Sequence, residues 1–478
     1  MPDRTQRIET DILVIGAGSA GLSVAAGAVQ MGARVVLVEK GRMGGDCLNT
    51  GCIPSKALLA SAKAAHAVAG MAALGIDAGP ATADFRRVHD HVHDVIAGIA
   101  PHDSEERFEG LGVTVIKATA RFTGRREVEA GGRIIRARRI VLATGSAPAA
   151  PPIPGLEDIP YLTNETVFDL TERPDHLLVI GAGPIGLELA QAFRRLGSKV
   201  TVLEKFHALP KDDPELTKIV LDRLRAEGVD LREGVDIAGL EKTGSGVTVR
   251  LNAEGGATGT VSGSHLLVAA GRKPVVDGLD LEAAGIDYDK GGVKTDARLR
   301  SSNRRVFAIG DVRGGYQFTH VAGYDAGIVI RNVLFRLPAK ADYAAVPWVT
   351  YTDPELAHVG LNEAQARERH GDSIQVLRAP YEKNDRARAE RHIEGLVKVI
   401  AHKGRPVGAS IAGAAAGELI QLWTLAIGQR IKLSTIAGAI SPYPTLSELN
   451  KTVAGSSFTK QLFSERTKKL VRVLQKLG

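Results

Sequence analysis

One arrangement of apolar and polar positions occurs twice in this chain. Residues 12–15 form a continuous apolar run, followed by glycines at the first, third and sixth positions after it and then by a helical pattern. Residues 177–180 form a second apolar run with glycines at the same three spacings. A short apolar run bounded by turn residues is typical of a strand buried on both faces. Each glycine set therefore predicts a tight turn from a buried strand into a helix.

Each of these units continues into a second apolar run that ends in an acid. The runs are residues 35–39 and 200–204, and both the glycines and the acids Glu39 and Glu204 are displaced by 165 residues. In such a unit the glycines permit the turn and the approach of a pyrophosphate, the helix N-terminus faces the phosphates, and the acid accepts from a ribose hydroxyl. A single glycine motif is weak, but the matched pair predicts two dinucleotide sites.

The overall composition is that of a globular chain with several domains. It has 478 residues, of which 44% are hydrophobic, and this favours about three domains at roughly 150 residues each. The polar start of the chain shows no signal-peptide core, and no run of about 18 apolar residues predicts a membrane span. Aromatic residues make up only 4%, with no nucleic-acid recognition motif, so we expect no nucleic-acid partner.

The net charge of +7 is concentrated at one end. Residues 459–478 carry six basic residues and one acid, and Phe463, Leu470, Leu474 and Leu477 recur at helical spacing. This predicts a basic amphipathic helix over 459–478, which could contact an anionic membrane or a partner. We favour packing of this helix on its own dimer, with its lysines in water, over membrane contact.

Cys47 and Cys52 are the only cysteines, and they lie five residues apart in a glycine-rich segment. A metal-binding pair and two unrelated buried thiols are the alternatives to a redox pair. A zinc site needs four ligands, usually in two clusters, and the chain has no second cysteine pair. Because no cysteine remains for structural bridges, we expect a reducing, cytoplasmic compartment.

The segment from Cys47 through Gly-Cys-Ile-Pro-Ser-Lys56 resembles the redox-active disulfide of the flavin-dependent pyridine nucleotide-disulfide oxidoreductases, in particular the lipoamide dehydrogenase and mercuric reductase branches. The resemblance covers nearly the whole chain up to about residue 455. It implies an α/β fold of two doubly wound, Rossmann-like dinucleotide-binding domains plus a C-terminal α+β dimerisation domain. It also implies FAD and NAD(P)H as cofactors and a homodimer whose active site is shared across the interface.

The domain limits then follow from composition. Proline-rich residues 148–154 predict a stiff crossing out of the FAD domain, and residues 269–274 predict the return. We expect a discontinuous FAD-binding domain at 1–150 and 275–345 and an NAD(P)-binding domain at 151–274. The dimer-interface domain is expected at 346–458, before the basic helix at 459–478.

The first glycine unit, next to the cysteines, is expected to bind FAD. Two further strand ends, residues 140–146 and 305–311, resemble the family's remaining FAD-contacting strands, with Asp311 hydrogen-bonded to the ribityl chain; an ordinary turn aspartate is the alternative reading of Asp311. The full set expected at FAD is Gly16, Gly18, Ala20, Gly21, Glu39, Lys40, Gly45, Asp46, Lys56, Ala118, Ala143, Thr144, Gly145, Ser146, Gly310, Asp311, Thr319 and His320.

The second glycine unit is expected to bind the nicotinamide nucleotide. Glu204 favours NADH, because a carboxylate accepts from a free 2′-hydroxyl and repels a 2′-phosphate, although Lys205 next to it weakens the preference. Pro184 stands where some relatives carry a gating tyrosine, so we expect no such gate. The set expected at NAD(P) is Gly181, Gly183, Pro184, Ile185, Gly186, Glu188, Glu204, Lys205, Gly271 and Arg272.

The resemblance assigns roles around the cysteine pair. Cys52 would face the flavin as a thiolate, its pKa lowered by the N-terminus of a helix over residues 55–69. Cys47 would be the interchange thiol that meets the acceptor. Lys56 would form an ion pair with Glu188 near the flavin, a solvated Lys and Glu being the alternative.

One position departs from the family pattern. The family's histidine before a proline, oriented by a glutamate five residues later, corresponds here to Tyr443 and Glu448. An ordinary tyrosine has a pKa near 10 and cannot take a thiol proton at neutral pH as imidazole can. It can still donate a hydrogen bond to a thiolate or steady a metal ion.

Mercuric reductase carries tyrosine at this place, but it also uses a C-terminal cysteine pair that this chain lacks. The sequence therefore predicts an NAD(P)H oxidoreductase with a thiol-reactive acceptor, either a small-molecule disulfide or a metal ion. Dihydrolipoamide dehydrogenase and a flavin redox sensor with little turnover are the alternatives. His89 and His93 have the spacing of helical metal ligands, but we expect them on an exposed helix face and predict no metal site.

Overall fold

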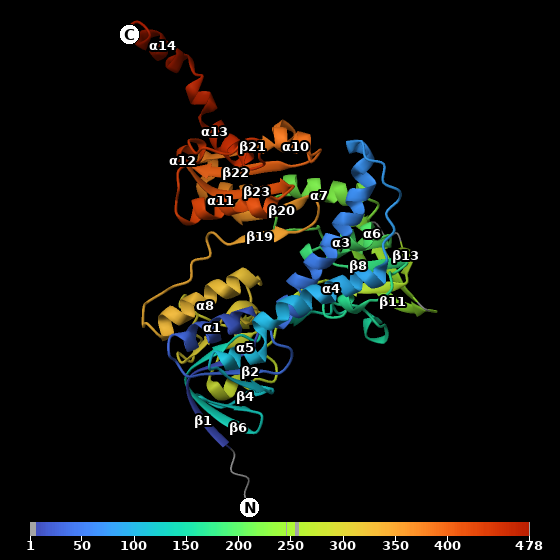
Figure 1. The fold of residues 1–478 in the computed structure, drawn as a ribbon, viewed down its shortest axis with the longest axis vertical. Helices are drawn as coiled ribbons and strands as arrows, with labels where there is room; N and C mark the ends of the chain where they lie inside the picture. The colour runs from blue at the N-terminus through green and yellow to red at the C-terminus, as the bar shows by residue number, and fades with distance from the viewer. Residues whose placement is uncertain (1–5, 245, 254–257, 478) are drawn as a thin grey trace, which may run out of the picture. The chain divides into compact units, whose positions relative to one another are not determined.

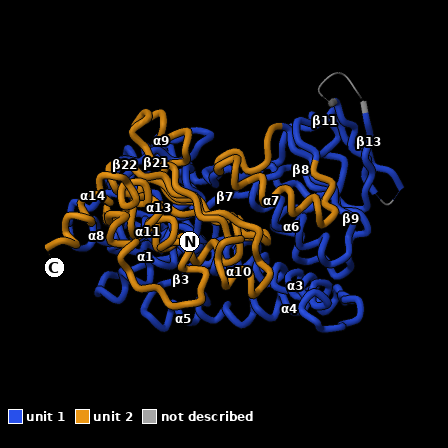
Figure 2. Tube along the Cα trace, turned by 90° about the horizontal axis from the view of Figure 1, so that it is seen from above, with its two compact units in different colours: residues 1–205, 232–342 blue, residues 206–231, 343–478 orange. Residues whose placement is uncertain are grey.

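The computed structural model describes residues 6–244, 246–253 and 258–477, and it divides into two compact units. The first contains residues 1–205 and 232–342, and the second contains residues 206–231 and 343–478 (Figure 2). Each unit is described separately. The fold is α/β in the first and α+β in the second, as the sequence predicts.

The first sheet of unit one has seven strands in the order β3-β2-β1-β6-β5-β4, with β18 also paired to β6. Strands β3, β2, β1, β6 and β18 run parallel, whereas β4 and β5 form an antiparallel hairpin. The strands are β1 (Gln6–Ile15), β2 (Val35–Glu39), β3 (Thr114–Lys117), β4 (Ala120–Gly124), β5 (Glu127–Ala130), β6 (Arg133–Leu142) and β18 (Val306–Ala308).

Both faces of this sheet are covered, which explains the continuous apolar runs. Ile12 and Val14 belong to the core on one face, and Leu13 and Ile15 belong to the core on the other. The first core is completed by two helices that pack side by side, as Figure 1 shows. They are α1 (Ser19–Gln30) and α8 (Thr319–Val333).

A second set of sheets in unit one contains the other glycine unit. Parallel strands β9, β8 and β14 are neighbours, and β11, β12 and β13 form an antiparallel sheet. Two short ladders, β7 with β15 and β16 with β17, complete the unit. The bounds are β7 (Ser146–Pro148), β8 (His176–Ile180), β9 (Lys199–Leu203), β11 (Val235–Thr243), β12 (Gly246–Ala253), β13 (Thr258–Gly263), β14 (His265–Val268), β15 (Arg272–Pro274), β16 (Tyr288–Asp289) and β17 (Gly292–Val293).

The remaining helices of unit one lie near the cysteine segment or follow the second glycine turn. Helices α3 and α6 pack on each other, and α3 also packs on α4 (Figure 1). The bounds are α2 (Gly45–Asn49), α3 (Cys52–Gly70), α4 (Phe85–Ile99), α5 (Glu105–Gly110) and α6 (Pro184–Arg195).

One stretch among the described residues, Gly45–Leu74, is long and apolar enough to cross a membrane by length and composition alone. The mean hydropathy of its 18-residue window is 1.4. The stretch is not a single continuous α-helix, because Thr50 and Gly51 separate α2 from α3. It also carries Asp46 and Lys56, both bonded to other elements of unit one. We therefore interpret it as the segment that presents the cysteines.

Unit two is built on an antiparallel five-stranded sheet in the order β19-β20-β23-β22-β21. Its core includes the fully buried Trp423 and Tyr381. The strands are β19 (Pro347–Thr350), β20 (Glu355–Gly360), β21 (Ile374–Pro380), β22 (Leu396–His402) and β23 (Arg405–Gly413). The helices are α7 (Pro214–Ala226), α9 (Glu363–His370), α10 (Asp385–Ala389), α11 (Ala416–Gly428), α12 (Leu433–Ala437), α13 (Glu448–Leu462) and α14 (Glu465–Leu474). Strand β10 (Asp230–Arg232) lies where the chain passes between the units.

The predicted single segment 151–274 is divided by this partition, because residues 206–231 group with unit two. Helix α7 packs against β20 and β23. The buried Lys398 ammonium lies 2.8 Å from an Asp213 carboxylate oxygen, 2.9 Å from one of Glu215 and 2.8 Å from one of Glu363. A buried cation requires such partners, and these acids tie the start of α7 to the sheet of unit two.

The predicted helix at 459–478 is also corrected. Helix α13 continues to Leu462, and α14 begins only at Glu465. The Ser464 hydroxyl accepts from the Thr467 backbone N–H at 3.3 Å, which caps a new helix at this point. Phe463 therefore lies in the link between two helices.

Candidate active site

The first glycine turn joins β1 to α1. Gly16 has a φ of +103°, and a Cβ built there would lie 2.3 Å from the Ala143 carbonyl oxygen. A Cβ on Gly21 would lie 1.8 Å from the Gly16 carbonyl oxygen. Only glycine fits at these two positions, because the first needs a left-handed backbone and the third needs contact between helix and strand.

The second turn, from β8 to α6, repeats this geometry. Gly181 also has a φ of +103°, and a Cβ on Gly186 would lie 2.0 Å from the Gly181 carbonyl oxygen. The middle glycines behave differently from these. A Cβ on Gly18 would meet nothing nearer than 3.9 Å, and a Cβ on Gly183 would meet nothing within 4 Å. The backbone faces open space at the position where a pyrophosphate needs close approach, so both turns fit a dinucleotide.

The acid at the end of each second strand reaches back to its glycine turn. Glu39 accepts from the Ala17 backbone N–H at 2.6 Å, and Glu204 accepts from the Ala182 N–H at 2.8 Å. Both carboxylates thus lie at the mouth of the turn, within the region where a ribose hydroxyl binds in such units. Lys205 points elsewhere, because its ammonium pairs with Asp236 at 2.8 Å.

Cys47 lies in α2, and Cys52 is the first residue of α3; both are free thiols. The Cys52 sulfur lies 3.5 Å from the Thr319 hydroxyl at the start of α8. The hydrogen bond from the Cys47 thiol, with smaller effects of Thr319 and the Lys56 charge, lowers the pKa of Cys52 to about 6. The same hydrogen bond and burial raise the pKa of Cys47.

The two sulfurs therefore differ in protonation at neutral pH. Cys52 is the thiolate, and Cys47 keeps its proton and donates it toward Cys52. The lowered Cys52 pKa agrees in direction with the prediction, but the largest cause is its neighbour thiol rather than the helix N-terminus alone.

The predicted ion pair is present. Lys56 of α3 lies 2.8 Å from the Glu188 carboxylate of α6, and the Glu188 side chain is only 6% exposed. Helices α3 and α6 pack directly on each other, which brings the cysteine helix and the second glycine unit together. A lysine four residues after Cys52 also supplies the positive charge that helps to keep that sulfur ionised.

A second polar network connects the cysteine segment to the predicted FAD strands. Ser146 donates to Asp311 at 2.6 Å, and Arg272 donates to the Ser146 hydroxyl at 2.7 Å. The Arg272 guanidinium also lies 3.2 Å from the Asp46 carboxylate. Burial raises the pKa of the Asp311 carboxyl. The network joins three residues predicted at FAD through an arginine predicted at NAD(P), so we revise the assignment of Arg272.

Two members of this network were not among the predicted site residues. Asn164 is buried and donates to Asp46 at 2.9 Å and to the Thr50 carbonyl at 3.1 Å. Thr50 donates to the same Asp46 carboxylate at 2.8 Å. Thr50 lies within the cysteine motif, but Asn164 belongs to no recognisable motif, and only the folded arrangement shows that both bond Asp46.

The other residues predicted at FAD lie on the same elements of unit one. Thr144 donates to the Val275 carbonyl at 2.7 Å, and Gly145 and Gly310 have positive φ. The Ala118 backbone N–H bonds the Glu39 carbonyl, and Lys40 follows that residue at the end of β2. The remaining members, which stand at strand ends or helix starts, are Ala20, Gly45, Ala143, Thr319 and His320.

The remaining residues predicted at NAD(P) surround the second turn. Pro184 and Ile185 open α6, and the Ile185 side chain is 38% exposed. Gly271 has a φ of +134° just before β15 and bonds the Ala149 N–H through its carbonyl.

Tyr443 and Glu448 both lie in unit two, and their side chains bond different partners. The Tyr443 hydroxyl donates to Asp385 of α10 at 3.0 Å, and the Asp385 carboxylate raises the pKa of Tyr443. Glu448 instead accepts from the Thr445 backbone N–H at 3.4 Å. Asp385 lies 58 residues before Tyr443, so no local pattern in the sequence connects them.

The histidines of α4 form no metal site. The His89 and His93 ring centroids lie 4.2 Å apart with the rings tilted by 42°, and His93 is 3.2 Å from the Phe168 carbonyl oxygen. No cluster of three or more potential ligands occurs within the described ranges.

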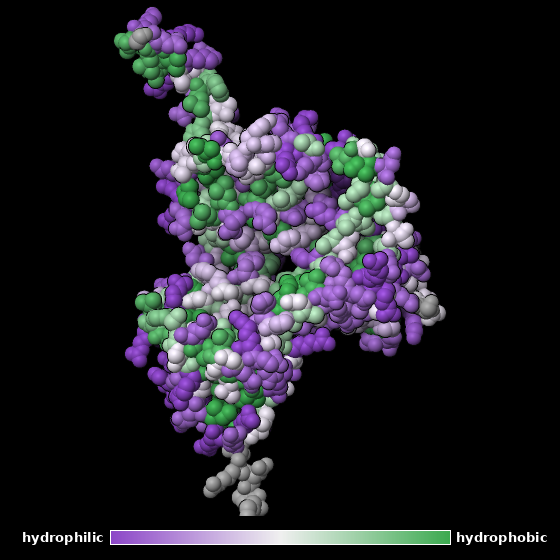
Figure 3. Space-filling view, in the orientation of Figure 1, coloured by the Kyte–Doolittle hydropathy of each residue, from purple (hydrophilic) through white to green (hydrophobic). Residues whose placement is uncertain are grey.

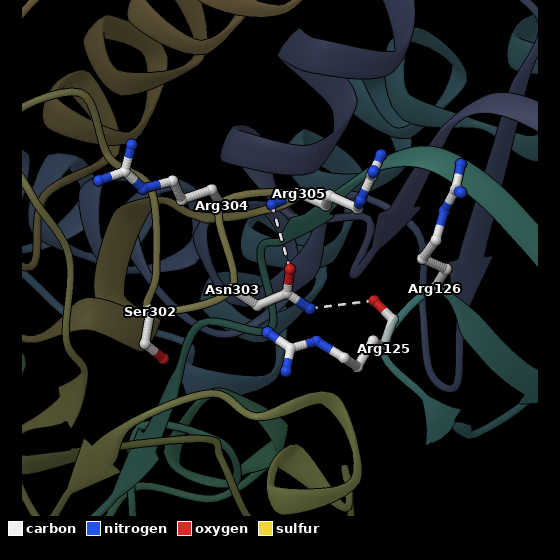
Figure 4. A pocket seen from close by; sticks show the side chains of 6 residues that line it. All are labelled: Arg125, Arg126, Ser302, Asn303, Arg304 and Arg305. Carbon is white, nitrogen blue, oxygen red and sulfur yellow. Dashed lines mark hydrogen bonds between the residues drawn. The ribbon is translucent and has the colours of Figure 1, made fainter.

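A cavity of about 410 Å³ lies away from all of these groups. Figure 4 shows the Asn303 amide at its centre, bonded to the Arg125 carbonyl at 3.0 Å and to the Arg305 N–H at 3.2 Å. It contains no residue predicted at a cofactor, and its lining consists of Arg125, Arg126, Ser302, Asn303, Arg304 and Arg305.

Comparison with known proteins gives the same family for the whole chain. The family model described as pyridine nucleotide-disulphide oxidoreductase matches residues 10–326, and the model of its dimerisation domain matches residues 346–454. A mercuric reductase of Streptomyces lividans is 35% identical over 461 residues, which cover 95% of this chain and 97% of the relative. A dihydrolipoyl dehydrogenase of Bacillus subtilis strain 168 is also 35% identical over 461 residues, covering 94% and 96%.

Among solved structures, the Cu(II) complex of the HOCl-induced flavoprotein disulfide reductase RclA from Escherichia coli matches with a TM-score of 0.84 and 29% identity. The match covers 93% of this chain and 99% of that one. The two kinds of enzyme among the curated relatives are equally similar, so similarity alone does not select an acceptor.

Proposed function

The chain belongs to the pyridine nucleotide-disulphide oxidoreductase family, and from this premise we propose that it reduces a thiol-binding metal ion or disulfide through Cys47 and Cys52. It is a FAD-dependent oxidoreductase that uses NAD(P)H. Its dimerisation domain supports a homodimer. The proposal concerns two points: the residues that carry the electrons and the acceptor that receives them.

FAD, when bound, accepts a hydride from the nicotinamide and passes the electron pair to a disulfide. The chain's own residues would then hold the products of that step. Two electrons and two protons convert the Cys47–Cys52 disulfide to the dithiol. The lowered pKa of Cys52 and the raised pKa of Cys47 leave one thiolate and one thiol, so one of the two protons leaves the pair.

The acceptor would meet Cys47. For a disulfide acceptor, Cys47 must first lose its proton, then attack one acceptor sulfur and release the other as a thiol once it is protonated. The Cys52 thiolate then attacks the Cys47 sulfur, breaks the bond between Cys47 and the acceptor, and releases the second acceptor sulfur, which takes a proton from water as the Cys47–Cys52 bond is restored. For a metal ion, both sulfurs can ligate and the Cys47 proton passes to water. The two electrons released as the disulfide forms reduce one Hg(II) to the neutral metal, or two Cu(II) ions to Cu(I).

The observation that carries the choice of acceptor is the bond from Tyr443 to Asp385. This carboxylate raises the pKa of Tyr443, so the phenol stays protonated at neutral pH and cannot take the Cys47 proton as imidazole does. We infer that Tyr443 of the partner subunit lies at a site shared across the dimer, where its oxygen can accept a hydrogen bond or ligate a metal ion while its one proton is donated to Asp385. Disulfide interchange needs a base, whereas metal ligation displaces the proton directly, so a thiol-binding metal ion is favoured over lipoamide.

We further propose NADH as the preferred donor, because Glu204 lies at the second glycine turn and Lys205 is paired with Asp236. We also propose a reducing, cytoplasmic compartment, because the sequence has no cysteine beyond the redox pair for a structural bridge.

A stopped-flow screen of the NADH-reduced enzyme tests the acceptor. The reduced protein is mixed with Cu(II), Hg(II), lipoamide, glutathione disulfide and a quinone, and flavin reoxidation is followed. We expect faster reoxidation by the thiol-binding metals than by either disulfide, and we expect Cys47→Ser to abolish the difference. Lipoamide turnover faster than metal reduction would overturn the choice of acceptor and favour a dihydrolipoamide dehydrogenase.

Tyr443→His is the matched test of the missing base. It restores a group that accepts a proton near neutral pH, so lipoamide reduction is expected to rise by about 10- to 100-fold while metal reduction changes little. An unchanged rate with lipoamide would show that Tyr443 does not limit proton transfer. Rapid NADH bleaching of the flavin, followed by turnover with any acceptor, would exclude a sensor without turnover.

A further inference from the structure

Helix α14 is encoded by its own sequence and does not depend on the core of unit two. None of its ten residues is buried. Ser464 caps its start, and the Thr467 hydroxyl donates to the Gln461 carbonyl at 2.8 Å. The segment also lies beyond residue 454, where the match to the dimerisation domain ends.

The helix has two chemically distinct sides. At 100° per residue, Leu470, Val473, Leu474 and, in the following turn, Leu477 lie on one side. Their exposed fractions are 56%, 57%, 54% and 80%. Figure 3 shows hydrophobic and hydrophilic side chains on this helix, which is labelled at the C-terminal end in Figure 1.

The opposite side is basic. It carries the cations Lys468, Lys469, Arg472 and Lys476, and the one acid of the helix, Glu465, pairs with Lys468 at 2.8 Å. A fifth cation, Arg466, lies in the first turn on the apolar side. An exposed apolar stripe of this kind needs an occupant that tolerates positive charge beside it. A second copy of the same helix would bring five more cations against these five, which opposes pairing of the helices in a dimer.

An anionic bilayer offers both of the required surfaces. Its acyl boundary takes an apolar stripe, and its headgroups attract lysine and arginine. Ten helical residues extend about 15 Å, half the thickness of the hydrocarbon core, so the helix can lie in the interface but cannot cross it. Each homodimer would carry two such helices, which multiplies weak single contacts.

We propose that α14 and the turn after it form an interfacial anchor that binds the surface of a membrane containing anionic lipid. The leucine and valine stripe enters the headgroup boundary, and the four cations lie among the lipid headgroups. This inference is independent of the acceptor proposed above.

Vesicle co-sedimentation of the FAD-loaded 478-residue chain tests the anchor. Vesicles of phosphatidylcholine with about 30% phosphatidylglycerol are expected to bind the protein at least about tenfold more strongly than pure phosphatidylcholine. Raising the salt concentration should weaken this binding, because exposed charges are screened.

Two variants separate the two sides of the helix. Leu470→Gln with Leu474→Gln removes apolar contact, and Lys468→Gln with Lys469→Gln removes charge; each pair is expected to lower binding about tenfold or more. Leu74→Gln and Lys242→Gln are matched controls, because these residues are exposed elsewhere in the described chain and should leave binding unchanged.

Flavin absorbance and light scattering check that every variant is folded and dimeric. Equal binding to both vesicle types, or no binding to either, would overturn the anchor. A loss of dimer mass in the Leu470→Gln, Leu474→Gln variant would also overturn it, because a second copy would then be the occupant. Loss of vesicle binding by a folded dimer in both helix variants, with unchanged controls, is the result that supports it.

Discussion

The two glycine turns of unit one have nearly the same backbone and very different neighbours. Gly16 and Gly181 share a φ of +103°, and the third glycine of each turn lies against the carbonyl of the first. The cysteine segment lies beside the first turn: Gly18 bridges Gly44, and a Cβ on Gly45 would lie 2.7 Å from the Gly18 Cα, although a Cβ on Gly18 itself would meet nothing nearer than 3.9 Å. The second turn has no such bridge among the described residues, and a Cβ on its middle glycine would meet nothing within 4 Å.

This difference shows how one unit can serve two kinds of ligand. The turn itself supplies the tight bend and the phosphate-facing helix, and both copies retain these. The surroundings then decide whether the ligand is enclosed or exchanges. We expect the first turn, which lies beside the cysteine segment, to retain FAD and the open second turn to exchange NAD(P)H, and the following experiments test that division.

The largest effects are expected from bulky side chains at the third glycines. Gly21→Val places atoms where a Cβ alone already lies 1.8 Å from the Gly16 oxygen. Overpacking of this kind commonly costs about 1–3 kcal/mol, and more where backbone must move, so the protein should be colourless or unfolded. Gly186→Val, with its Cβ 2.0 Å from the Gly181 oxygen, should remain yellow and lose NADH reduction at least about 100-fold.

Flavin absorbance of the purified protein and stopped-flow reduction by NADH measure these two losses. Gly98→Val in exposed α4 is the control, because a Cβ there meets nothing within 4 Å. A colourless Gly186→Val protein would contradict the division between an enclosed and an exchanging turn.

The cysteine pair lies beside the first turn and has no counterpart at the second. Substitution of either cysteine should therefore give the next largest effect. With NADH, the protein should show a long-wavelength thiolate-to-flavin band, and Cys52→Ser should remove it and lower acceptor turnover by about 1000-fold. In the unmodified protein the band should grow as pH rises through about 6, because the lowered pKa makes Cys52 a thiolate above that pH.

Absorbance spectra of NADH-reduced protein across pH 4–9 (roughly the range in which thiols of lowered pKa titrate) measure the band. Cys47→Ser is the companion variant, and it should keep a band while losing turnover. If the band persisted in Cys52→Ser, the assignment of Cys52 as the flavin-facing sulfur would be wrong.

Substitution of Arg272 tests whether this arginine stabilises the FAD site or the nicotinamide-nucleotide site. Arg272→Ala leaves Ser146, Asn164 and Asp46 without their shared donor. The loss of charged hydrogen bonds costs about 1–3 kcal/mol, so FAD retention should fall roughly 10- to 100-fold with little change in the KM for NADH. Arg272→Lys should recover part of this loss, and exposed Lys273→Ala should show none.

Ultrafiltration of the dilute protein, followed by measurement of released FAD, gives the retention. A raised KM for NADH with unchanged FAD retention would restore the original assignment of Arg272 to the nicotinamide nucleotide.

The two turns also show which features of the fold and site could be predicted from the sequence. The glycine spacing, the acids after it and the strands before it are local patterns, and each predicted the geometry found. Lys56 and Glu188 were predicted from family resemblance, and their bond is present at 2.8 Å. Asn164 was missed, because its bond to Asp46 joins segments 118 residues apart and follows no period.

Two other features of the site also depend on contacts between residues far apart in the sequence. Arg272 was placed with the nicotinamide-nucleotide residues by the resemblance, and the antiparallel pairing of β15 with β7 sets it opposite Pro148, where it bonds Ser146. The resemblance named Tyr443 without a partner for its hydroxyl, and a short helix in unit two presents Asp385 to it. Register and tertiary contact decided both cases, and neither is encoded in a short window of sequence.

The smallest effect is expected from substitution of Glu39 and Glu204, the acids at the two turns where a ribose is expected to bind. Glu204→Gln keeps an oxygen that can accept from Ala182 but removes the charge, so the preference for NADH over NADPH in kcat/KM should fall about tenfold. Glu39→Gln should leave that preference unchanged and weaken only FAD retention, because its carboxylate bonds Ala17 in the first turn. Steady-state kinetics with both nucleotides measures the ratio. If Glu39→Gln changed the NADH preference as much as Glu204→Gln, the two turns would not act as separate sites, and the different surroundings of the glycines would not explain their roles.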